Sequence, residues 1–148
     1  MNLEQLNISY INDNFKDWFN WEKVKPVKVK MTEKVLERAM NDKEISDELK
    51  PAPITLAQLF GSLKNLDKNS WYLTYIKDKN NTLRAVHVGR RGDGWHVDAC
   101  SVSIPHRWGA GCRVFSCNFG TQTLEPSDFI TRKEFEEFKA KIEKVIKI

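Results

Sequence analysis

The sequence predicts an α+β protein in which helices surround one antiparallel sheet of about four strands. Two capping boxes precede apolar stripes at helical spacing, Thr55 with Gln58 and Thr131 with Glu134. Four short segments between residues 70 and 119 read as strands and are separated by turn residues. A chain of 148 residues fits one domain and can bury about two thirds of its unfolded surface. A stable core is therefore expected without disulfide or metal support.

Residues 1–50 are predicted to form a helical and extended segment that packs on the core. Residues 12–21 place aromatic side chains at helical spacing after an Asn or Asp N-cap. Residues 24–30 alternate, but Pro26 favours an edge strand or an extended arm there. Residues 32–40 put four apolar side chains on one helical face and predict a second helix. Two prolines within residues 47–54 predict a linker.

Residues 51–148 are predicted to form the α+β domain that displays a ligand-binding surface. Its first helix spans residues 54–66, and a C-terminal helix follows the second capping box, with its apolar face between residues 135 and 146. Asn and Asp between the first two strands predict a hairpin turn, and glycines predict a second turn after the second strand. The four predicted strands cover residues 70–78, 82–89, 94–102 and 112–119.

Composition and charge bound the class of protein. The net charge is +4, but residues 51–120 carry +5, whereas residues 1–50 carry −1 and residues 121–148 carry zero. A field of this size can favour an anionic partner without requiring one. We expect no signal peptide and no membrane span, because no apolar run approaches about 18 residues. The expectation is a cytoplasmic or virion-associated protein with three reduced cysteines.

Residues 84–120 use a different set of amino acids from the rest of the chain. They hold all three histidines, all three cysteines and five of the seven arginines. They hold no Lys, Glu, Gln or Met, although these four types occur throughout the rest of the chain. If Lys, Glu, Gln and Met were as frequent here as in the rest of the chain, these residues would contain about 11 of them. Strand propensity explains part of the deficit, but it does not separate Lys from Arg so sharply.

Two causes would explain this stretch. Arginine is preferred over lysine for bidentate recognition of phosphate or carboxylate groups. Alternatively, codons ending in C or T at variable positions encode His, Cys, Arg and Asp but never Lys, Glu, Gln, Met or Trp. Only Trp95 and Trp108 depart from that permitted set. The second cause also accounts for the histidines and cysteines, which phosphate binding does not.

Strand alternation separates the residues of this stretch into two groups. One face takes Val86, Val88, Val97 and Ala99, which suit a core. The other takes His87, Gly89, His96, Asp98 and Cys100, which share no chemistry except membership of the permitted set.

Residues 54–118 contain the frame "ITLAQLF…YIKDKNNTLRAV…DGWHVDACSV…P..W.AG.RVFS.N". This frame resembles a recurrent domain in small proteins of phages and ultra-small bacteria. That domain resembles the targets of diversity-generating retroelements, in which template adenines are randomised on copying. The resemblance covers residues 54–118 and implies a variable region at about residues 84–118 on a constant scaffold. It also implies a non-enzymatic ligand-binding function, with a C-type-lectin-like fold as one candidate. The chain continues here beyond the variable stretch to Ile148, which departs from the usual pattern.

Other kinds of site fit the residues less well. The His and Cys spacings are His-x3-Cys, Cys-x11-Cys and Cys-x4-Cys, which match no standard zinc pattern. No nucleophile motif or phosphate-binding glycine loop is present. Trp71, Trp95 and Trp108 are either base-stacking platforms or packed frame residues.

We therefore predict a binding protein without metal, cofactor or catalytic residues, whose partner is a protein or a small molecule. The alternative is a phage or mobile-element protein that binds nucleic acid or a host defence component through the Arg-rich turn. The predicted ligand-binding residues are His87, Gly89, Arg90, Arg91, Gly92, His96, Asp98, Cys100, Ser103, His106, Arg107, Gly109 and Cys112.

Overall fold

The computed structural model describes residues 3–92, 94–103 and 107–120. The chain divides after Asn118, and the fold below is that of the residues before this point. The predicted C-terminal helix, with its capping box at Thr131 and Glu134, lies outside the described residues.

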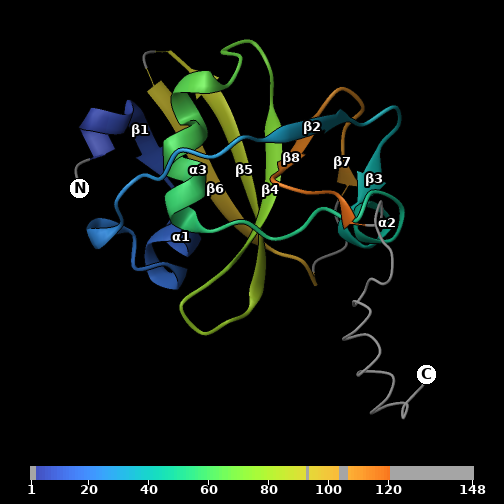
Figure 1. Ribbon diagram of the computed structural model, residues 1–148, viewed down its shortest axis with the longest axis horizontal. Helices are drawn as coiled ribbons and strands as arrows, with labels where there is room; N and C mark the ends of the chain where they lie inside the picture. The colour runs from blue at the N-terminus through green and yellow to red at the C-terminus, as the bar shows by residue number, and fades with distance from the viewer. Residues whose placement is uncertain (1–2, 93, 104–106, 121–148) are drawn as a thin grey trace. The chain divides into compact units, whose positions relative to one another are not determined.

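A mixed six-stranded sheet forms the centre of the fold (Figure 1). Its order is β1-β6-β5-β4-β8-β2, with β1 parallel to β6 and β8 parallel to β4. The strands span Ile8–Ile11 (β1), Thr32–Val35 (β2), Tyr72–Lys77 (β4), Leu83–Arg91 (β5), Gly94–Ser101 (β6) and Arg113–Ser116 (β8). The α+β class is thus confirmed, and all four predicted strands are present. The prediction of a purely antiparallel sheet of about four strands was wrong.

Both additional strands come from the N-terminal segment, residues 1–50. β1 pairs with β6, and β2 pairs with β8, so this segment supplies the two edges of the sheet. Each of these strands is short and gains its hydrogen bonds from a strand that lies far away in the chain. The segment is therefore part of the sheet as well as a cover for the core.

The helix predicted over residues 32–40 is replaced by β2, a turn and the short strand β3 (Met40–Asn41). The Leu36 amide donates to the Cys112 carbonyl at 2.9 Å, which continues the contact of this segment with the β8 region. Helix α2 (Asp42–Glu48) begins only after it, with a capping box between Asn41 and Glu44. Pairing with β8 thus outweighs the helical periodicity of these residues.

Helices cover one face of the sheet. α1 (Asp13–Trp18) and α3 (Leu56–Ser62) lie on this face (Figure 1). They contribute Phe15, Leu59 and Phe60 to a core that includes Val86 and other inward residues of the strands. Two of the predicted N-caps, at Asn12 and Thr55, are confirmed. Asn12 accepts the Phe15 amide at 3.0 Å, and the predicted capping box at the start of α3 is complete.

Residues 24–31 form an extended arm, as the proline suggested. The Val27 amide donates to the Ala57 carbonyl of α3 at 3.0 Å. A side chain at Gly61 would meet the Val27 backbone, so the glycine permits this close approach. Short 3-10 turns lie at Leu3–Leu6 (η1), Trp21–Lys23 (η2) and Leu63–Asn65 (η3).

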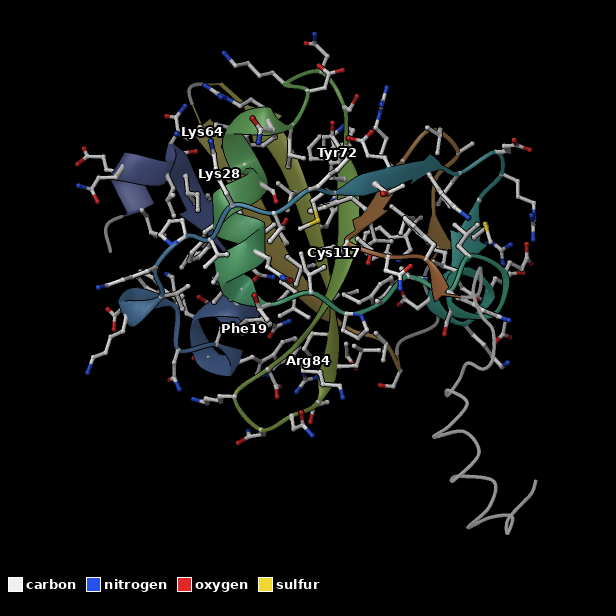
Figure 2. All side chains as sticks on the ribbon, in the orientation of Figure 1. Phe19, Lys28, Lys64, Tyr72, Arg84 and Cys117 are labelled. Carbon is white, nitrogen blue, oxygen red and sulfur yellow. The ribbon has the colours of Figure 1, made fainter. Side chains whose placement is uncertain are left out.

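The β4–β5 hairpin turn is held by one carboxylate. Asp78 accepts the Asn80 amide at 2.8 Å, the Thr82 amide at 2.9 Å and the Arg84 guanidinium at 2.8 Å. Arg84, labelled in Figure 2, also lies 3.6 Å from the centre of the Trp18 ring. Burial acts to raise the pKa of Asp78, but these hydrogen bonds and the Arg84 charge together lower it below its ordinary value.

Candidate binding face on β5 and β6

The register of β5 and β6 separates their residues into two faces, as predicted. Val86 pairs with Ala99 and Val88 with Val97, and all four side chains are fully buried against the helices. His87 pairs with Asp98 and Gly89 with His96, so these residues share the opposite face. On that face His87, His96, Asp98 and Cys100 are half-buried.

Trp71 lies flat over this second face. Its indole is stacked on the His87 imidazole, with ring centroids 5.0 Å apart and an interplanar angle of 13°. A Cβ at Gly89 would come within 1.7 Å of Trp71 Cζ3. The Arg91 guanidinium lies 5.4 Å from the Trp71 ring centre. The predicted contact residue Gly89 is therefore buried beneath an aromatic ring rather than open to a ligand.

Further rings extend this arrangement in both directions. His87 also contacts Trp108, with centroids 5.0 Å apart, and Tyr10 of β1 contacts His96 at 5.1 Å. Because His96 pairs with Gly89, which Trp71 covers, the five rings follow one another across the sheet. We call Tyr10, His96, Trp71, His87 and Trp108 the aromatic row. Tyr10 and Trp71 are 48% and 39% exposed, so the row presents ring surface to solvent.

A buried carboxylate fixes the far end of the aromatic row. Asp42 Oδ1 accepts both the Trp108 indole N–H at 2.8 Å and the Tyr75 hydroxyl at 2.7 Å. Burial raises the pKa of Tyr75, and the neighbouring carboxylate of Asp42 raises it further. The indole of Trp108 is thereby tied to both α2 and the main sheet.

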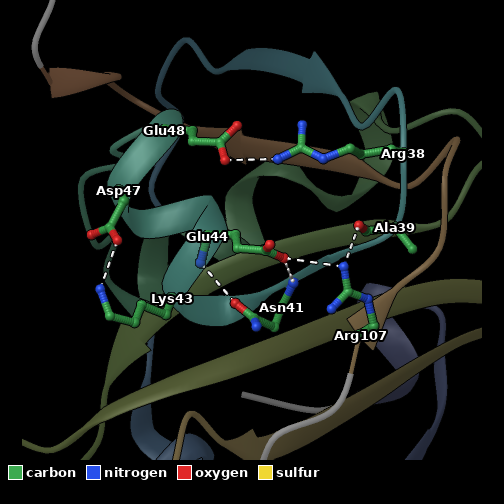
Figure 3. Close-up of polar contacts among 8 residues, drawn as sticks. All are labelled: Arg38, Ala39, Asn41, Lys43, Glu44, Asp47, Glu48 and Arg107. Atoms are coloured by element: carbon green, nitrogen blue, oxygen red, sulfur yellow. Dashed lines mark hydrogen bonds and ion pairs between the residues drawn. The ribbon is translucent and has the colours of Figure 1, made fainter.

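Polar contacts around α2 hold the small sheet formed by β3 and β7 (Arg107–Trp108; Figure 3). Arg107 donates to the Ala39 carbonyl at 3.2 Å and lies 3.4 Å from Glu44 Oε1. The same Glu44 oxygen accepts the Asn41 amide in the capping box at 2.9 Å. Arg107, predicted to contact a ligand, thus also holds β7 on α2.

The predicted Arg-rich turn does not present its two arginines together. Arg90 lies on the helix-covered side, with its guanidinium 5.6 Å from the Trp95 ring centre, whereas Arg91 lies over Trp71 on the other side. Adjacent residues of a strand point to opposite faces, and both arginines belong to β5. The two guanidinium groups therefore lie on opposite sides of the sheet.

An open groove of ≈ 640 Å³ lies beside the aromatic row. Trp71, His87 and Trp108 form its aromatic wall, and the glycine-rich turn before β8 forms the other side. Its remaining lining residues are Val35, Asn69, Ser70, Arg107, Gly109, Ala110, Gly111, Cys112 and Arg113.

Cys100 and Cys112 lack the features of an activated nucleophile. Burial raises the pKa of Cys112 to about 11, and burial together with Asp98 raises the pKa of Cys100. A reactive thiol needs a lowered pKa. Cys112, predicted to contact a ligand, is 7% exposed and lines the groove beside the aromatic row. Among the described residues, no group of three His, Cys, Asp or Glu side chains could hold a metal ion.

The remaining predicted residues are distributed as follows. Gly92, Ser103 and Gly109 are exposed, and His106 lies outside the described residues. Tyr10 was missed, because its strand is too short to be recognised without its partner. Trp71 was considered as a platform but not included in the predicted set, because it precedes residues 84–120.

Comparisons with protein-family models, curated proteins and solved structures found no match to this chain. In the part of the chain that the structure describes, no helix is both long and apolar enough to cross a membrane.

Proposed function

We propose that this chain is a binding module whose ligand, a protein or a small molecule, contacts the aromatic row and the adjacent groove. The observation that carries the proposal is the series of partly exposed rings across β1, β6 and β5, continued by Trp71 and Trp108. Aromatic and imidazole groups offer large contact areas at low entropic cost, and their polar atoms add hydrogen bonds.

The distribution of residue types supports a diversified face. Four central inward positions of β5 and β6, Val86, Val88, Val97 and Ala99, hold small or β-branched apolar residues, whereas His87, His96, Asp98 and Cys100 share the other face. The latter all belong to the set that codons ending in C or T can encode. This agrees with the resemblance to retroelement targets, which we retain as part of the proposal together with a C-type-lectin-like scaffold.

Two matched libraries test the proposal. The first randomises His87, His96, Asp98 and Cys100 with codons ending in C, and the second randomises four inward positions of the same strands: Val86, Val88, Val97 and Ala99. Protease resistance of the displayed variants measures folding. We expect many more members of the first library than of the second to fold, because half-buried side chains cost less to replace than the four fully buried ones. Similar losses in both libraries would refute the assignment of the face.

Selection from the folded first library then tests binding itself. We expect variants that bind individual targets of a protein and small-molecule panel, with affinity lost on Trp71→Ala. The Trp21→Ala change, outside the row, serves as the control. Failure to enrich any saturable binder, or equal loss in both variants, would contradict a binding role for the row.

The gene provides an independent test of the diversification. The codons of the variable positions are expected to end in C or T. They are also expected to align with AAC or AAT in a nearby repeat beside a reverse transcriptase. Ordinary codon usage without such a repeat would remove the retroelement hypothesis and leave the binding face to be explained by its chemistry alone.

A further inference from the structure

A second pocket lies where the helix-covered side of the sheet meets η1 and η3. Its volume is ≈ 340 Å³, within the range of small-molecule sites. The lining residues are Gln5, Leu6, Asn7, Phe60, Leu63, Lys64, Leu66, Lys68, Arg90 and Trp95. None of them belongs to the aromatic row or to the groove beside it.

Three cations meet at this pocket. Lys64 and Lys68 come from η3 and the segment after it, and Arg90 comes from β5. Lys64 is labelled in Figure 2 at the end of α3. No carboxylate of the described residues lines the pocket. Asp67, between the two lysines in sequence, instead accepts the Asn69 amide at 2.9 Å and the Ser70 hydroxyl at 3.1 Å.

Apolar side chains form much of the rest of the pocket wall. Phe60, Leu63 and Trp95 are each 2% exposed and belong to the core. Arg90 lies over the Trp95 ring, which limits the rotamers of its guanidinium. A guanidinium held in place can bind a phosphate or carboxylate through two parallel hydrogen bonds. Gln5 and Asn7 add side-chain amides at the rim.

We infer that this pocket binds a small organic anion, a phosphate monoester or a carboxylate attached to an apolar ring. The three cations would hold the anionic group, and the ring would contact Leu6, Leu63 and Leu66. This site is independent of the proposed function, because it lies on the opposite side of β5 from the aromatic row. It also gives Arg90 a role that the predicted Arg-rich turn does not.

Titration of the ¹⁵N-labelled protein with phenyl phosphate, followed by NMR, tests the inference. We expect saturable shifts of the Trp95 indole N–H, identified with a Trp95→Phe variant, and of the backbone amides of Gln5 and Asn7. The dissociation constant is expected to be on the order of 1 mM or below. Inorganic phosphate should bind about 10-fold more weakly, and benzyl alcohol should not saturate. Equal affinities for the two phosphates would overturn the ring contact.

Arg90→Gln and Arg91→Gln form a matched pair, since the two residues are adjacent in one strand and lose the same charge. Arg90→Gln should weaken phenyl phosphate binding on the order of 10-fold, and Arg91→Gln by less than about 2-fold. Lys64→Gln should weaken it about 3-fold and keeps the test valid if the Arg90 variant unfolds. Equal effects of the two Arg variants, or no saturable shift at about 10 mM phenyl phosphate, would overturn the inference.

Discussion

Replacing Gly89 with alanine should destabilise the protein through Trp71. A Cβ at position 89 would lie 1.7 Å from Trp71 Cζ3, so the indole must leave its position over the strand. Trp71 is 39% exposed and therefore has well over half of its surface covered. About 150 Å² of buried ring surface at about 25 cal/mol per Å² corresponds to roughly 4 kcal/mol, taken as an upper value.

Alanine itself favours a strand over glycine by about 0.5–1 kcal/mol, which offsets part of the loss. If the displaced indole keeps some contacts, we expect Gly89→Ala to lower the free energy of unfolding by about 1–2 kcal/mol. In a Trp71→Ala background the same change should instead be neutral or stabilising by about 0.5–1 kcal/mol, because the obstructing ring is gone.

Urea unfolding of the four proteins of this cycle measures the coupling. Gly109→Ala is the control, since a Cβ there would meet nothing within 4 Å and the change should stay within about 0.5 kcal/mol. An identical effect of Gly89→Ala with and without Trp71 would refute the reasoning. The outcome also bears on the proposed function, because any side chain at position 89 would displace the central ring of the aromatic row.

Three further predictions concern the frame. Tyr75→Phe removes a hydroxyl donor to the buried Asp42 carboxylate and should cost about 1–3 kcal/mol in urea unfolding, whereas an unchanged midpoint would contradict that role. The pKa of Asp78 is lowered in the folded protein, so its ion pair with Arg84 should contribute stability above the ordinary carboxyl pKa of about 3.9. That contribution is lost as the pH falls through the pKa that Asp78 has in the folded protein. Between pH 6 and pH 2 the melting temperature should therefore fall less in Asp78→Asn than in the unchanged protein. Identical dependence of the melting temperature on pH in the two proteins would refute this. Trp95→Ala removes a large ring that is 2% exposed and should lower the free energy of unfolding by about 3–5 kcal/mol, measured with denaturant. A loss below about 1 kcal/mol would contradict this prediction.

Structural features encoded by neighbouring residues were predictable from the sequence. The side-chain cap at Asn12, the capping box at Thr55 and the Asp78 turn each depend on groups close together in the chain. The buried face of β5 and β6 follows from alternation alone, since every second residue points to the same side. The residue bias of 84–120 is likewise a property of the sequence and needs no structure.

The tertiary structure decided which distant segments pair and therefore what the candidate site contains. Residues 32–35 suit a helix by periodicity, but hydrogen bonds to β8 make them an edge strand. The pairing of β1 with β6 brings Tyr10 beside His96, and the packing of Trp71 over Gly89 fills a position predicted to be open. A single sequence specifies local hydrogen bonds and side-chain alternation directly, whereas register and ring packing are set by the free energy of the whole assembled sheet.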